Sequence, residues 1–170
     1  PALLTALCKK SNLESLNFIV DDRNIHYFQQ LANLQKSTKV RLDLGSYGEE
    51  EIIHLALTPL HNIEKMHIEF KCHFPDDRIY AGTLSEAFFE NMGRNWSNLK
   101  ELGIWNKRVL INNALEHLEK LQELTFDLTG IDFYFHHNSI TYPHMTSLTF
   151  LQGDQISNLQ DLLKKLPNLK

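Results

Sequence analysis

A short phrase of apolar residues, apolar-x-x-apolar-x-apolar, recurs along the chain. Its copies are Leu13/Leu16/Phe18, Ile63/Met66/Ile68, Leu99/Leu102/Ile104, Leu121/Leu124/Phe126 and Met145/Leu148/Phe150. Another copy begins at Leu169, and a weaker one alternates at Val40, Leu42 and Leu44. From Leu99 onward the copies follow one another every 22 to 24 residues. A period of this length, with one strand and one helix in each unit, is typical of a stacked solenoid.

Between these phrases, apolar residues recur at helical spacing. This spacing predicts helices over about 1–10, 24–36, 49–57, 83–92, 112–118 and 157–166. Thr83 or Ser85 is expected to open the fourth helix and Pro167 to end the last. In the fourth helix the side chains expected to face the sheet are Leu84, Ala87, Phe88 and Met92. Neither layer can bury its apolar side alone, so the helices should cover one face of a parallel sheet.

Two segments depart from the period. The longer interval between Ile63 and Leu99 predicts an insertion loop at about 71–82, in which Phe74-Pro75-Asp76-Asp77 forms a turn. The stretch 131–142 contains three aromatic residues and two histidines in a row, but no helical pattern. Its rings either pack beneath the loop or form an exposed binding loop, and the sequence leaves both open.

The phrases Ser-Asn-Leu-Lys-Glu-Leu-Gly-Ile (97–104) and Lys-Leu-Gln-Glu-Leu-Thr-Phe (120–126) resemble the leucine-rich repeat superfamily. The resemblance covers nearly the whole chain. It implies a right-handed α/β solenoid of about six irregular repeats, with parallel strands on the concave face and helices on the convex face. The family pattern expects Asn or Cys three residues after the second strand leucine, where this chain has Asp21, Tyr47, Lys71, Lys107, Thr129 and Gly153. Such irregular repeats resemble those of intracellular F-box or nucleotide-binding sensor proteins.

Alternation along the predicted strands decides which side chains a partner would meet. The apolar positions point inward, so the residues between and just after them face the concave surface. These are Ser15, Asn17, Ile19, Arg41, Asp43, Gly45, Lys65, His67, Glu69, Glu101, Gly103, Trp105, Glu123, Thr125, Asp127, Ser147, Thr149 and Leu151. From this surface and its neighbours, the predicted partner-binding residues are Arg41, Asp43, His67, Glu69, Phe70, Trp105, Asp127 and Leu128.

Trp105 is the predicted anchor of this surface. An exposed tryptophan beside Phe70 and Leu128, with acidic and polar neighbours, has the composition of an interface anchor. Alternatively, the indole tucks into the edge of the core or beneath a neighbouring loop. The sequence leaves both placements open.

Composition narrows the class of protein. With 42% apolar and 22% charged residues, the chain fits a single domain spanning 1–170. Because it starts at Pro1 and stops inside a repeat, we expect it to be a fragment of a longer protein. A net charge of −4 provides no broad basic field, so nucleic acid and anionic membrane are poor candidates as main partners. Two cysteines and no transmembrane run favour an intracellular location, cytoplasmic or nuclear.

Catalytic and metal-binding patterns are not visible. Cys72-His73 and His136-His137 are the tight clusters, but neighbouring residues on a strand point to opposite faces and make no ready chelate. The chain has no His-Glu-x-x-His or Cys-x-x-Cys spacing and no glycine-rich phosphate loop. We therefore expect no enzyme, no cofactor and no metal, and instead a scaffold that binds a protein partner.

The resemblance suggests two parent proteins for such a scaffold. One is an F-box-type substrate receptor of a ubiquitin ligase, in which the repeats hold the target. The alternative is the ligand-sensing or autoinhibitory repeat region of a nucleotide-binding immune-type receptor.

Overall fold

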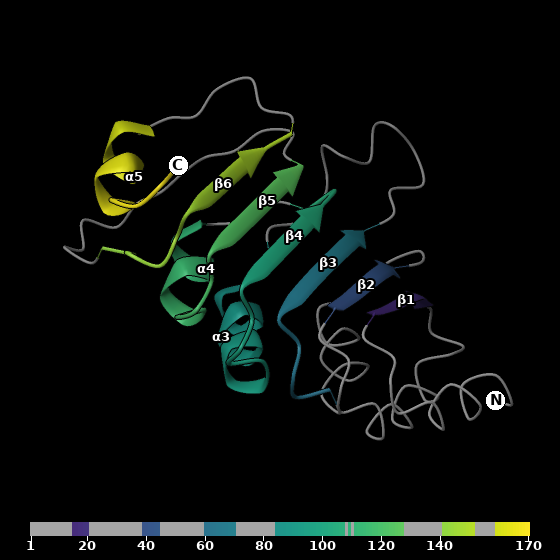
Figure 1. Ribbon diagram of the computed structural model, residues 1–170. Helices are drawn as coiled ribbons and strands as arrows, with labels where there is room; N and C mark the ends of the chain where they lie inside the picture. Colours follow the sequence, from purple (N-terminus) through teal and green to yellow (C-terminus); the bar gives the residue numbers. More distant parts are fainter. Residues whose placement is uncertain are drawn as a thin grey trace, which may run out of the picture.

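The computed structural model describes residues 15–20, 39–44, 60–70, 84–107, 109, 111–127, 141–151 and 159–170. Six strands form one open, all-parallel sheet in the order of the chain (Figure 1). They are β1 (Ser15–Val20), β2 (Lys39–Leu44), β3 (Lys65–Phe70), β4 (Glu101–Trp105), β5 (Glu123–Asp127) and β6 (Ser147–Phe150). The described helices, all on one side of the sheet, are α3 (Glu86–Asn95), α4 (Ile111–His117) and α5 (Leu159–Lys165) (Figure 1). The fold is therefore α/β.

The five full apolar phrases predicted from the sequence each contribute a strand, and so does the weaker copy at Val40. The strands pair so that equivalent positions of successive phrases lie side by side. One row across the sheet contains Leu16, Val40, Met66, Leu102, Leu124 and Leu148. All of these are buried except Leu148, which is partly buried on the edge strand β6.

A tight turn recurs before the strands and again at the C-terminal end. In each turn, the backbone N–H of one residue donates to the carbonyl oxygen three residues earlier. The pairs are Leu99 to Trp96 (2.9 Å), Leu121 to Leu118 (3.0 Å), Met145 to Tyr142 (3.3 Å) and Leu169 to Leu166 (3.2 Å). The backbone geometry therefore repeats with the same period as the sequence.

The residues just before β3, β4 and β5 bond to the next copy. The carbonyl oxygen of each accepts two backbone N–H groups at the start of the neighbouring strand. Glu64 accepts from Lys100 (2.7 Å) and Glu101 (3.0 Å). Lys100 in turn accepts from Gln122 (2.8 Å) and Glu123 (3.0 Å), and Gln122 accepts from Thr146 (2.8 Å) and Ser147 (3.0 Å). These bonds fix the register between neighbouring strands before the ladder itself begins.

The core lies between the sheet and the helices. Inward side chains of the strands, such as Ile68, Ile104 and Phe126, form one cluster with those of the helices. The largest fully buried side chains include Phe88 and Phe89 on α3, Trp96 just after it, and Phe126 on β5. Burial of aromatic side chains of this size contributes strongly to the stability of the central copies.

Helix α3 begins as predicted, and Leu84, Phe88 and Met92 are buried as predicted, but one of the four residues expected to face the sheet does not. The Ser85 hydroxyl accepts a hydrogen bond from the Phe88 N–H (3.1 Å), which is the expected N-cap. Ala87, predicted to face the sheet, is exposed, and Phe89 is fully buried in its place. Placing Phe88, Phe89 and Met92 inward buries two aromatic rings, and this gain outweighs that of burying one methyl group.

Other predictions fall on residues that the structure does not describe. The helices expected over 1–10, 24–36 and 49–57 lie outside the described residues, as do the insertion loop at 71–82 and the aromatic stretch up to 140. The helices expected over 112–118 and 157–166 are confirmed as α4 and α5.

Helices α3 and α4 pack closely against each other at Gly93. A Cβ atom at this position would lie 2.2 Å from the backbone carbonyl oxygen of His117. Because the contact is with backbone, a rotamer change cannot relieve it. On the same helix pair, His117 Nε2 lies 3.5 Å from Glu86 Oε1. Gly93 therefore sets how closely the two helices approach.

We expect Gly93→Ala to lower the free energy of unfolding by about 1–3 kcal/mol, the usual cost of overpacking. Alanine is a better helix former than glycine by up to about 1 kcal/mol. If helix propensity alone decided the outcome, Gly93→Ala would therefore raise the free energy of unfolding. Urea denaturation monitored by circular dichroism measures the change, and Asn91→Ala in the same helix serves as the control. An increase in stability for Gly93→Ala would contradict the close approach of α3 and α4.

Candidate functional site

The sheet face opposite the helices is the candidate site, and we call it the open face. The described helices all cover the other side of the sheet (Figure 1). Its described side chains are Ser15, Asn17, Ile19, Lys39, Arg41, Asp43, Lys65, His67, Glu69, Glu101, Trp105, Glu123, Thr125, Ser147 and Thr149, each exposed or half-buried. The strand alternation predicted from the sequence is confirmed at these positions.

Arg41 joins the carboxylates of two neighbouring strands. Its Nε lies 3.3 Å from Asp43 Oδ1 on β2, and its terminal nitrogen lies 3.0 Å from Glu69 Oε2 on β3. The hydrogen bond to Asp43, followed by the charges of both carboxylates, raises the pKa of Arg41. Because these side chains are exposed, the pairs add little to stability, but they hold the guanidinium in one orientation.

Lys65 forms a second cross-strand pair. It donates a hydrogen bond to Glu101, its direct register partner on β4. This bond raises the pKa of Lys65, with smaller contributions from the charges of Glu101, Glu123 and Glu64. Glu123 is the next residue along the row on β5, opposite Glu101. The strand starts therefore change from basic on β2 and β3 to acidic on β4 and β5.

Trp105 lies on the open face and folds back across its own strand. A Cβ atom on Gly103 would lie 2.2 Å from Cη2 of the indole, so the ring covers that glycine. The ring also packs against His67 of β3, with centroids 5.0 Å apart and planes at 51°. Trp105 is half-buried and is not part of the core cluster. Of the two placements open from the sequence, the structure therefore has the indole outside the core.

His67 is affected by this arrangement. Partial burial is the main cause that lowers its pKa, and the positive charges of Arg41 and Lys65 lower it further. The carboxylate of Glu101 acts in the opposite direction. These effects favour the neutral form of His67, on a surface where half of the other described side chains are charged.

One predicted partner-binding residue is wrong. Phe70 was expected beside Trp105, but it is only 5% exposed and belongs to the core cluster. It follows Met66 and Ile68 in the two-residue alternation, so the pleat turns its ring inward. The ammonium of Lys107 lies 5.2 Å from the centre of this ring.

The remaining predicted residues divide into two groups. Arg41, Asp43, His67 and Glu69 come together on β2 and β3, and Trp105 contacts this group through His67. Asp127 is the register partner of Trp105 on β5, whereas Leu128 lies outside the described residues. The sequence reasoning gave Gly103 no role, although a glycine inside a strand is a known sign of close approach.

The described residues also bear on metal binding and on membrane insertion. Among the described residues, no group of three or more His, Cys, Asp or Glu side chains could hold a metal ion. Within the same part of the chain, no helix is both long and apolar enough to cross a membrane. The chain matches no protein-family model, and a search of curated proteins finds no match either.

We expect Gly103→Ala to displace the Trp105 ring from its position over β4. The clash is with a side chain that can rotate, so the strand should remain intact. In a nitrogen–proton correlation spectrum, the Trp105 indole signal should shift while that of the buried Trp96 stays in place. An unchanged Trp105 signal would mean that the indole does not cover Gly103.

We expect His67 to titrate below its ordinary pKa of 6.5 in the folded protein. Because the unfolded chain then takes up the proton first, the stability contributed by neutral His67 is present above the ordinary pKa and is lost as the pH falls through the lowered value. Trp105→Ala removes the ring that packs against His67 and should raise this pKa. Proton NMR titration of the imidazole measures both values, and a pKa at or above 6.5 in the unsubstituted protein would contradict the packing.

Proposed function

We propose that this chain is a leucine-rich-repeat solenoid that binds a protein partner on its open face. The recurrence of the same turn, the same backbone bonds and the same strand in successive copies supports the solenoid. The resemblance of the phrases at 97–104 and 120–126 to leucine-rich repeats supports the same assignment.

The observation that carries the binding proposal is the position of Trp105. A half-buried indole, held over Gly103 and against His67, presents a large ring on a polar surface. Tryptophan is among the residues most enriched at the energetic centres of interfaces. Since the ring is already positioned, a partner would lose little side-chain entropy on burying it.

An interface also needs groups that select the right partner, and the ion pairs beside Trp105 are of this kind. Arg41 joins Asp43 and Glu69 in one connected group next to His67. At the starts of β3 and β4, Lys65 pairs with Glu101. Charged groups that are already oriented can select a partner by complementarity and exclude others. A partner that covers Trp105 with an apolar pocket and meets these charges at the rim fits the face.

The role we propose is recognition of the target in an F-box-type ubiquitin ligase. In such proteins the repeats hold the substrate and a separate domain recruits the ligase. The F-box assignment rests on the resemblance of the irregular repeats to those of F-box proteins. The proposed binding surface rests on the residues of the open face.

We expect Trp105→Ala in the full-length protein to weaken binding of the target by more than about fivefold, which corresponds to about 1 kcal/mol. Affinity capture from native cells, with quantitative mass spectrometry, compares it with the unsubstituted protein. Lys164→Ala on α5, an exposed residue on another face, is the matched control and should retain the target. Ligase adaptor subunits should remain bound in both variants.

The capture result also separates the parts of the proposal. Loss of the target with Lys164→Ala as well as Trp105→Ala would place binding elsewhere than the open face. A target retained in both variants would contradict the role of Trp105. A stable assembly without ligase subunits would overturn the F-box assignment.

A further inference from the structure

The charges at the strand starts of the open face are arranged antisymmetrically across the sheet. Followed from β1 to β6 through the strand register, this row reads Ser15, Lys39, Lys65, Glu101, Glu123 and Ser147. If the order is reversed and lysine is exchanged for glutamate, the same row results. The row is therefore complementary in charge to a second copy of itself that runs in the opposite order.

The outer charges of this row have no ion pair within the chain. Lys65 bonds to Glu101, its neighbour in the row. Lys39 and Glu123 are both exposed, and within the described part of the chain neither forms an ion pair. They lie three strand spacings apart, or about 14 Å, which is too far for them to bond to each other. Both charges are thus available to another molecule.

A twofold axis parallel to the strands, between β3 and β4, would bring two open faces together in this opposite order. It places β2 of one copy over β5 of the second copy, and β3 over β4. Lys39 then faces Glu123 of the second copy, and Lys65 faces Glu101. A self-complementary surface of this kind is what a symmetric homodimer requires. Facing sheets pack about 10 Å apart, a gap that a lysine and a glutamate side chain can bridge together.

The exposed apolar side chains fit the same axis. The Trp105 ring covers Gly103 on β4 and packs against His67 on β3, so it lies close to the line between these strands. The two indoles would therefore meet near the centre of the interface, where anchor residues concentrate. At the edges of the sheet, Ile19 on β1 is 59% exposed and Leu151, just after β6, is 53% exposed. These two side chains would face each other across the interface.

A twofold axis across the strands fits the charges less well. It would pair the lysines with Asp43 and Glu69, but it would place Glu123 against the position of Asp127. It would also place Arg41 against Arg41 of the second copy, and like charges in contact disfavour binding. The axis parallel to the strands has one like-charge contact, between Asp43 and the position of Asp127. There, Asp43 is already bonded to Arg41.

We propose that two copies of this chain pair through their open faces, about the axis parallel to the strands. The pairing is a property of the chain itself and does not depend on the proposed target. Because the second copy and a target would occupy the same face, the pair must separate before a target binds. Pairing therefore keeps Trp105 covered in the absence of a target.

Charge reversals in the full-length protein test this pairing, with sedimentation velocity at several concentrations as the measurement. Lys39→Glu and Glu123→Lys should each weaken the pair by about tenfold or more, because each turns two attractions into two repulsions. An equimolar mixture of the two variants should pair again, since every reversed residue then faces an opposite charge. Lys164→Glu on α5 is the matched control and should pair like the unsubstituted protein. Circular dichroism shows whether each variant is folded.

Three results would overturn the proposal. The first is an unsubstituted protein that stays monomeric at up to about 0.1 mM, which would leave the open face to a different protein. The second is a pair that both single variants form as tightly as the unsubstituted protein does. The third is a mixture that pairs no more tightly than either variant alone. Since no target is present in this experiment, its failure would leave the proposed function standing.

Discussion

The register between neighbouring strands is the constraint on which the rest of this structure depends. The carbonyl oxygens of Glu64, Lys100 and Gln122 each accept two N–H groups from the next copy, so β4, β5 and β6 each start at the same level as the strand before. A shift by one residue would turn the apolar side of a strand to solvent and its charged side to the core. Because the same bonds recur, each copy positions the next.

The chemistry of the open face follows from this register. Lys65 and Glu101 are paired because both begin their strands, and His67 lies opposite Gly103 for the same reason. The absence of a side chain on Gly103 leaves room for the Trp105 ring, which then reaches His67 across the strand boundary. The missing side chain of Gly103 thus allows Trp105, at the end of β4, to pack as an ordered part of the surface.

Period-two alternation was enough to predict all six strands and the outward residues of the open face, because it depends only on the pleat. It also implies that Phe70 points inward, and treating that residue as surface ignored its place after Met66 and Ile68. Helix faces were harder, since Ala87 and Phe89 both fit a helical period and the buried aromatic area decides between them. The orientation of Trp105 depends on a neighbour without a Cβ atom, and no periodic pattern carries that information.

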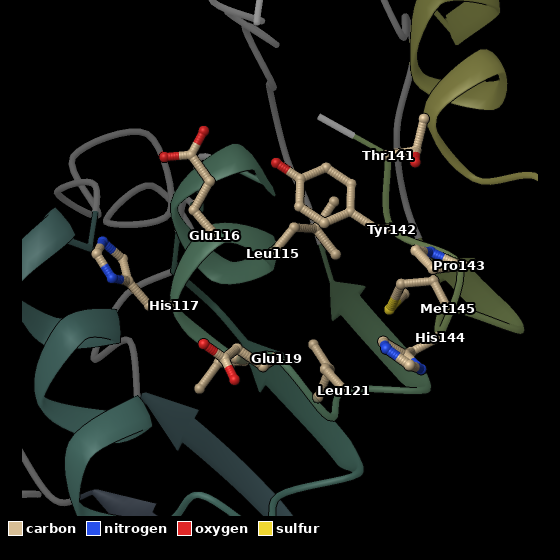
Figure 2. A pocket seen from close by; sticks show the side chains of 11 residues that line it. Leu115, Glu116, His117, Glu119, Leu121, Thr141, Tyr142, Pro143, His144 and Met145 are labelled. Atoms are coloured by element: carbon tan, nitrogen blue, oxygen red, sulfur yellow. The ribbon is translucent and has the colours of Figure 1, made fainter. Parts of the chain in front are cut away.

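Two features of the surface arise where the repeat is broken in different ways. At the open face the backbone keeps its period, but Gly103 stands between His67 and Thr125, and Trp105 stands between Glu69 and Asp127, so both rows change character at β4. Beside α4 the turn is kept, but Tyr142 takes the place of a buried apolar side chain and lines a pocket (Figure 2). Since the register bonds are made by backbone in both places, side chains there can vary without loss of the fold. A scaffold of this kind separates the residues that hold the sheet together from those available for binding, and the latter are found where the period fails.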